Sequence, residues 1–201
     1  MQDRKDDEPN KSLARDLFET KNIAGIQEVA GNLWHKDKRI QSDCDSVLEE
    51  IGRVKPELIS DYVLEYIKLL SSKNNRMVWG SMINLSLIAE LKADVIIEHL
   101  DLIVNTIDKG SVITKDSGVL TLAIVASVKA KYNRVIFPYL VNQLKTCRQK
   151  SVAQYAESIL LAVNPDNQAE YLSVLVQRLE SLSTPQQRRV KKLLGKFDKP
   201  K

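Results

Sequence analysis

The chain has 201 residues, of which 43% are hydrophobic and 28% are charged, and its formal net charge is +4. This hydrophobic content can bury a sizeable core and excludes a largely disordered chain. With seven glycines, six prolines and no runs of alternating β-branched residues, the sequence is expected to form an all-α protein.

Residues 1–10 predict a disordered or solvated tail, in which acidic residues outnumber basic ones, the opposite of a secretory signal. The longest apolar stretch, 119–128, is shorter than the ~20 residues that a membrane-spanning helix needs. Cys44 and Cys147 lie far apart in the sequence and are expected to be thiols without a disulfide. These features predict a soluble, cytoplasmic protein with no membrane partner.

Residues 11–36 are predicted to form an irregular helix pair at the N-terminal end of a single domain, 11–201. Their apolar residues recur at helical spacing and are Leu13, Leu17, Ile23, Ile26 and Val29. Trp34, which follows them, is expected to cap this pair.

An internal repeat of about 37 to 40 residues occupies 37–183, where four units follow one another. Ile51, Ile88 and Val125 mark the first halves at a spacing of 37, and the second halves match similarly, with a short insertion in the third unit. Such a period is typical of stacked helix pairs, so each unit should be a helix, a short turn and a second helix.

Prolines indicate where several of these helices begin. Pro56, Pro165 and Pro185 fall where a second helix or the final helix should start, and proline is tolerated in a first helical turn. Pro138 suggests a late start for the third unit's second helix, which would leave Arg134 in the turn.

Motifs for catalysis and cofactor binding are missing. The sequence has no G-x-x-x-x-G-K-[ST], G-x-G-x-x-G, G-x-S-x-G, H-E-x-x-H or C-x-x-C pattern. His35 and His99 are the two histidines, and His99 takes the place of Tyr62 in the repeat, which favours packing over metal binding. We therefore expect no enzymatic activity, no catalytic residue, no cofactor, no metal and no small-molecule substrate.

Charged residues of the second helices form the candidate partner-binding surface, because residues three and four apart share a helix face. The stripe of the second unit is acidic and comprises Asp94, Glu98, Asp101, Asn105 and Asp108. The corresponding stripe of the third unit is basic and comprises Arg134, Pro138, Val141, Lys145 and Arg148. Stripes of opposite charge suit a protein or peptide partner with complementary charges.

The third unit is basic as a whole, because 117–156 contains no acidic residue. Lys129 and Lys131 flank Tyr132 in the inserted turn, and we expect this aromatic residue to contact a partner. Trp79, in contrast, is expected to pack in the core.

Residues 184–201 predict a basic capping helix and tail, with Leu193, Leu194 and Phe197 docked inward. A basic segment keeps a nucleic-acid partner possible. The residues that would contact it are Lys150, Arg188, Arg189, Lys191 and Lys192.

The first helix of the fourth unit, 151–160, reads SVAQYAESIL, which is similar to the V-x-x-x-A-x-x-x-L pattern of HEAT-like repeats. On this pattern and its period, 38–183 resembles HEAT-like or armadillo-like repeat proteins. The resemblance implies a right-handed α-solenoid of about four to five helix pairs. It also implies a scaffold or adaptor that binds partners on a concave face formed by the second helices.

Two alternatives remain open. The charged stripes could serve only to solvate the exposed side of each second helix. Bacterial alkylpurine DNA glycosylases resemble the same repeat architecture, with a basic groove, aromatic residues and an aspartate that supports glycosidic cleavage. This chain departs from that pattern, because no aspartate follows Trp79 within a turn and the acidic stripe would repel phosphate.

Overall fold

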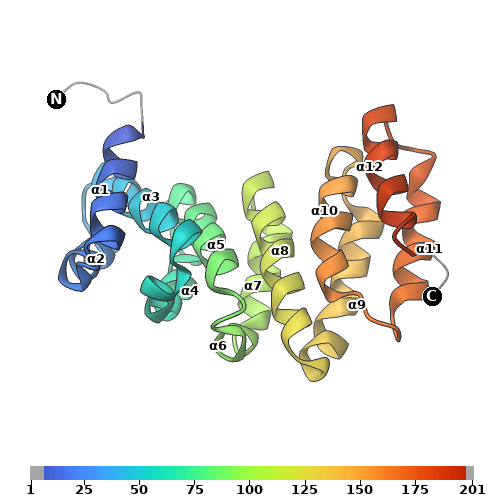
Figure 1. Cartoon of the computed structure of the whole chain (residues 1–201), viewed down its shortest axis with the longest axis horizontal. Helices are drawn as coiled ribbons and strands as arrows, with labels where there is room; N and C mark the ends of the chain where they lie inside the picture. Colours follow the sequence, from blue (N-terminus) through green and yellow to red (C-terminus); the bar gives the residue numbers. More distant parts are fainter. Residues whose placement is uncertain (1–6, 198–201) are drawn as a thin grey trace. The chain divides into compact units, whose positions relative to one another are not determined.

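The computed structural model describes residues 7–197 and is shown in Figure 1. Within this range the chain forms α-helices joined by turns and short 3-10 helices, and it contains no strand. The all-α prediction is confirmed. The helices divide into two compact units, unit 1 (Met1–Gly118) and unit 2 (Val119–Lys201), with the boundary inside α8 (Val112–Val128).

Unit 1 begins with an N-terminal helix pair. It continues with repeat units whose first half is one helix and whose second half is broken into shorter helices. The pair consists of α1 (Glu8–Glu19) and α2 (Ile23–Gly31), followed by the 3-10 helix η1 (Asn32–Trp34). The next elements are α3 (Lys38–Val54), η2 (Pro56–Leu58), η3 (Ser60–Tyr62) and α4 (Val63–Leu69). The last complete ones are α5 (Asn75–Ile88), α6 (Ala93–Ile97) and α7 (Leu100–Lys109).

Unit 2 contains the rest of α8, its second half α9, one further helix pair and a final helix. Its elements are α9 (Ala130–Thr146), η4 (Gln149–Ser151), α10 (Val152–Ile159), η5 (Leu160–Ala162), α11 (Gln168–Leu179) and α12 (Thr184–Leu194). The second halves of this unit, α9 and α11, are single helices as predicted.

Side-chain caps and prolines account for many of the helix starts. Asn22, Asp37 and Asn74 precede α2, α3 and α5, and each accepts a hydrogen bond from a backbone N–H of the first turn. Pro56 and Pro185 occupy the first turns of η2 and α12, as predicted.

Three predicted boundaries are wrong. Pro165 does not begin a helix but lies in the turn before α11, which starts at Gln168. Helix α1 begins at Glu8, inside the expected tail, because the buried Asn10 donates a hydrogen bond to Asp43 of α3 at 3.1 Å and fixes this end. The rest of the expected tail, residues 1–6, lies outside the described residues. Pro138 does not delay α9 but lies inside it, so Arg134 is helical.

The repeat spacing correctly locates the core. Ile51, Ile88 and Val125, the marker residues of the first halves, are all fully buried. Around them, Leu48 of α3 and Leu85 of α5 fill unit 1, and the two helices pack against each other. Unit 2 has its own core, to which α9, α10 and α11 contribute Ile136, Leu140, Ala153 and Tyr171. Apart from the buried Asp45, the charged side chains of residues 7–197 are therefore left partly or fully exposed around an apolar core.

Candidate functional site

The acidic residues predicted for the second unit lie on α6, on α7 and in the turn between them. They do not lie on one helix, because the helix is interrupted between Ile97 and Leu100. All are exposed, and we call them the acidic face: Asp94, Glu98, Asp101, Asn105 and Asp108. Asp101, Asn105 and Asp108 share one side of α7.

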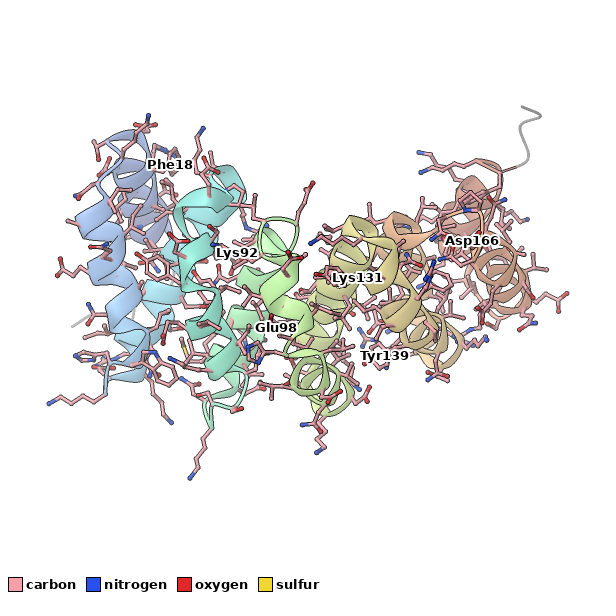
Figure 2. All side chains as sticks on the ribbon, turned by 90° about the horizontal axis from the view of Figure 1, so that it is seen from below. Phe18, Lys92, Glu98, Lys131, Tyr139 and Asp166 are labelled. Atoms are coloured by element: carbon pink, nitrogen blue, oxygen red, sulfur yellow. The ribbon has the colours of Figure 1, made fainter. Side chains whose placement is uncertain are left out.

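Two side-chain contacts join the second-half elements of unit 1. Lys92, at the start of α6, places its Nζ 2.8 Å from Oδ1 of Asp61 in η3. Trp34 donates from its indole Nε1 to Oε2 of Glu65 in α4 at 2.8 Å. Lys92 and Glu98, which flank α6, are labelled in Figure 2. The side chains of η1, α4 and α6 thus belong to a linked surface of unit 1.

Trp34 and Leu64 are exposed apolar side chains of this surface that the sequence did not single out as partner contacts. Trp34 is 51% exposed and Leu64 49%, so Trp34 is not enclosed by the pair that it was expected to cap. Glu65 fixes the indole, and it also accepts a hydrogen bond from Lys68 at 2.9 Å. The bonds from Lys68 and Trp34 hold the pKa of Glu65 below its ordinary value. A fixed, half-exposed tryptophan is a common anchor in protein interfaces.

A buried ion pair stiffens the first helices of unit 1. The fully buried carboxylate of Asp45 in α3 accepts from Arg76 at 2.5 Å and from Asn84 at 3.0 Å, both on α5. Burial raises the pKa of Asp45 to about 6, against the opposing effect of Arg76. The guanidinium of Arg76 also stacks on Trp79, 3.8 Å from the ring centre. This arrangement requires Gly80, because a Cβ there would collide with the Asp45 carboxylate.

The basic residues predicted in unit 2 do not form one stripe. Val141, in the middle of the predicted stripe, is buried, and Arg148 lies beyond the end of α9 and donates to Ser151 at 2.9 Å. Lys145 forms an ion pair with Glu170 of α11 at 3.3 Å. The prediction is wrong because the inner side of α9 extends through position 141.

The predicted position of Tyr132 in the inserted turn is also wrong. Because α9 begins at Ala130, Tyr132 occupies its first turn instead of a loop, and only 7% of it is exposed. The exposed Lys129 and Lys131 place their ammonium groups 5.3 and 5.1 Å from the centre of its ring. Tyr132 therefore makes cation–π contacts with two surface lysines.

A hollow of about 170 Å³ lies between the first half of α9 and the loop before α11. Its lining residues are Ala130, Asn133, Arg134, Phe137, Pro138, Asn164, Asp166 and Asn167. Figure 2 labels Lys131 and Asp166 in this part of unit 2. Because Pro138 has no N–H, the backbone carbonyl of Arg134 lacks its helical donor. The lining of the hollow thus includes an arginine and a carboxylate.

Asn133 forms the base of this hollow and uses its whole amide internally. Its Nδ2 donates to the carbonyls of Ala126 and Ala162 at 3.2 and 2.7 Å. Its Oδ1 accepts from Asn164 at 3.2 Å and from Asn167 at 2.9 Å. These four bonds fix the loop against α9, so Asn133 has a structural role.

The C-terminal helix α12 is docked by its apolar side. Val190 is fully buried, Leu193 is 5% exposed, and the ring of Phe197 lies 6.2 Å from that of Tyr171. The predicted nucleic-acid contacts Lys150, Arg188, Arg189, Lys191 and Lys192 are all exposed. Arg189 is bonded to both carboxylate oxygens of Glu157, at 2.9 and 2.6 Å. The last predicted basic residues, Lys199 and Lys201, lie outside the described residues.

Residues 7–197 contain neither a metal-binding cluster nor a membrane span. No group of three histidine, cysteine, aspartate or glutamate side chains in this range is placed to hold a metal ion. None of the helices described there has both the length and the apolar character needed to cross a membrane. The thiols of Cys44 and Cys147 are not joined in a disulfide.

Comparison with known proteins identifies the fold. No protein-family model and no curated protein matches the sequence. A designed armadillo repeat protein solved with the peptide (KR)4 is similar in structure, with a TM-score of 0.71 at 15% identity over 96% of this chain and 91% of that one. A computationally designed armadillo repeat protein for modular peptide recognition has a TM-score of 0.68 at 15% identity, over 93% and 90% of the chains. An engineered protein from a structural genomics consortium gives 0.68 at 20% identity, over 96% and 92%.

These similarities and the helix pairs described above confirm the predicted repeat architecture. The chain has an armadillo-type helical-repeat fold.

Proposed function

We propose that this protein is a non-enzymatic scaffold that binds a basic segment of a protein partner on the acidic face of unit 1. The observation that carries the proposal is the exposure of Glu98 and Asp101 at the junction of α6 and α7, with Asp94 and Asp108 on either side. Carboxylates grouped in this way attract lysine and arginine side chains and speed their association.

Charge alone would give only weak binding. An exposed ion pair contributes about 0.2–1 kcal/mol, so the acidic face would provide a few kcal/mol at most. Apolar contact has to supply the remainder, and Trp34 and Leu64 offer it on the neighbouring elements. We therefore assign selection of a basic partner to the carboxylates and much of the affinity to these two side chains.

The solved neighbours support a peptide as the partner. One designed armadillo repeat protein was solved in complex with (KR)4, a peptide of lysine and arginine, and another was designed for modular peptide recognition. That fold presents a peptide-binding surface in those proteins, and the acidic face gives this chain a surface of suitable charge.

The ion pairs of unit 2 favour a protein over a nucleic acid. Glu170 pairs with Lys145 and Glu157 with Arg189, so carboxylates interrupt the basic residues that would have to follow a phosphate backbone. The glycosylase alternative needs such a track as well. A labelled DNA duplex is therefore included as a competing ligand in the test.

The test measures fluorescence anisotropy of labelled (KR)4, of a peptide with glutamate at every position, and of the DNA duplex. The acidic-face variant combines Glu98→Lys with Asp101→Lys. The control variant combines Asp16→Lys with Glu19→Lys, the same charge change at exposed positions of α1. We expect (KR)4 to bind, the acidic-face variant to bind it at least about tenfold more weakly, and the control to bind it almost normally. Equal affinity of the two variants for (KR)4, or binding of DNA alone, would refute the proposal.

The contribution of the apolar anchor is measured with Trp34→Ala. Because the ring is fixed by Glu65 and half exposed, its loss should reduce the affinity for (KR)4 about tenfold while the salt dependence stays the same. An unchanged affinity would remove Trp34 from the binding surface.

A further inference from the structure

The outer side of α12 is basic, and it stays exposed because the opposite side of the helix is packed into unit 2. Arg188, Lys191 and Lys192 are exposed, and Lys196 follows in the next turn. The opposite side is held in unit 2 by Val190 and Leu193. No acidic residue occurs between 184 and 194. We call these four basic residues the basic face.

Glu157 acts on part of this basic face. Its pKa is lowered mainly by its hydrogen bonds with Arg189 and also by the charges of Lys192 and Lys196, but its ion pair is with Arg189. Within the described part of the chain, Arg188, Lys191 and Lys192 have no ion-pair partner. The basic face therefore remains available to a carboxylate surface of another molecule.

The basic face and the acidic face are opposite in charge, and both contain residues at helical spacing. On α12, Lys191 and Lys192 follow Arg188 by three and four positions, a rise of about 6 Å, and Lys196 lies just beyond the last residue of the helix, Leu194. On α7, Asp101 and Asp108 are about 10 Å apart along the axis. Two such surfaces, laid side by side, bring opposite charges together over about one helical turn.

We infer that the basic face of one copy of this protein binds the acidic face of a second copy. The inference rests on the proposed function, because it uses the same acidic face and the same preference for a basic ligand. Each copy carries both faces, so every contact joins two different faces, the basic face of one copy and the acidic face of the other. A copy whose acidic face is occupied in this way cannot bind its protein partner on that face.

The experiment is sedimentation velocity of the full chain at low and high salt over a hundredfold range of concentration. The basic-face variant combines Arg188→Glu with Lys192→Glu, and it is compared with the acidic-face variant defined above. The wild type should associate reversibly, and salt should dissociate it, because exposed charges are screened. In each variant the two reversals cancel the charge of one face and leave the other face unchanged, so each variant alone should stay monomeric. An equimolar mixture of the two variants pairs opposite faces again and should associate.

The inference would be overturned by a wild type that is monomeric throughout, by a basic-face variant that associates like the wild type, or by a mixture of variants that does not associate. The proposed function is tested separately, because the basic-face variant retains its acidic face and should bind (KR)4. A higher affinity of that variant for (KR)4 than that of the wild type, by a factor that does not depend on protein concentration, would mean that α12 covers the acidic face of its own copy. This result would refute the contact with a second copy. Circular dichroism melting of both variants shows whether they are folded.

Discussion

The buried carboxylate of Asp45 makes the stability of unit 1 depend on pH. Burial raises its pKa to about 6 in the folded protein, while the pKa of an aspartate in the unfolded chain is about 3.9. Between these values the folded state holds a proton that the unfolded chain has released. The free energy of unfolding therefore falls as the pH rises, and the stabilisation by this proton is complete below about pH 4 and absent above about pH 6.

The size of the effect follows from the shift in pKa. A difference of about two units corresponds to about 3 kcal/mol between the free energies of unfolding at the two ends of this range. Asp45→Asn removes the titrating group but keeps a neutral acceptor beside Arg76 and Asn84. The stability of the wild type relative to this variant should thus decrease by about 3 kcal/mol from about pH 4 to about pH 7.

Urea unfolding at several pH values measures this difference directly. Titration of the other carboxylates cancels because both proteins contain them. The control Asp16→Asn changes an exposed aspartate of α1 and should give a difference that is independent of pH. A flat curve for Asp45→Asn, or one that rises with pH, would show that burial does not dominate the pKa of this carboxylate.

Three further substitutions test other parts of the framework by urea unfolding. Gly80→Ala should destabilise the protein by about 1–3 kcal/mol, because its methyl group would collide with the Asp45 carboxylate, whereas an open helical site would gain stability from alanine. Arg178→Met should cost about 2 kcal/mol, since Arg178 donates to three carbonyls at the C-terminal end of α9; a loss of a few tenths would indicate that these bonds are negligible. Tyr171→Phe removes a 2.7 Å hydrogen bond to the carbonyl of Ala156 and should cost about 1 kcal/mol, and a gain in stability would contradict the assigned bond.

The core could be predicted from the sequence because burial in a helical repeat is periodic. Ile51 and Ile88 occupy equivalent positions in successive units, and both are fully buried. Helix boundaries were less predictable. The break after Ile97 contains neither proline nor glycine, whereas Pro138 lies within a continuous helix. In α9, burial of the flanking Ile136 and Phe137 outweighs the loss of one backbone hydrogen bond.

The charged surface was predictable in position but not in pairing. Glu98 and Asp101 are exposed, as expected for the outer side of a second half. The partner of Arg189 lies 32 positions away on α10, and the carbonyls bound by Arg178 lie 31 to 34 positions away. Contacts between neighbouring repeats depend on side-chain directions that a single sequence does not specify. The same limit explains why Trp34 was not identified as a surface anchor.

The amide of Asn133 restricts what can replace it. Aspartate would lack the two protons given to Ala126 and Ala162, and leucine would lack the acceptor of Asn164 and Asn167 as well. Glu98 and Asp101 of the acidic face, in contrast, are exposed side chains. Partner preference can therefore diverge by surface substitutions while this joint between α9 and α11 stays unchanged, so a lineage of such proteins could acquire new ligands without rebuilding its repeats.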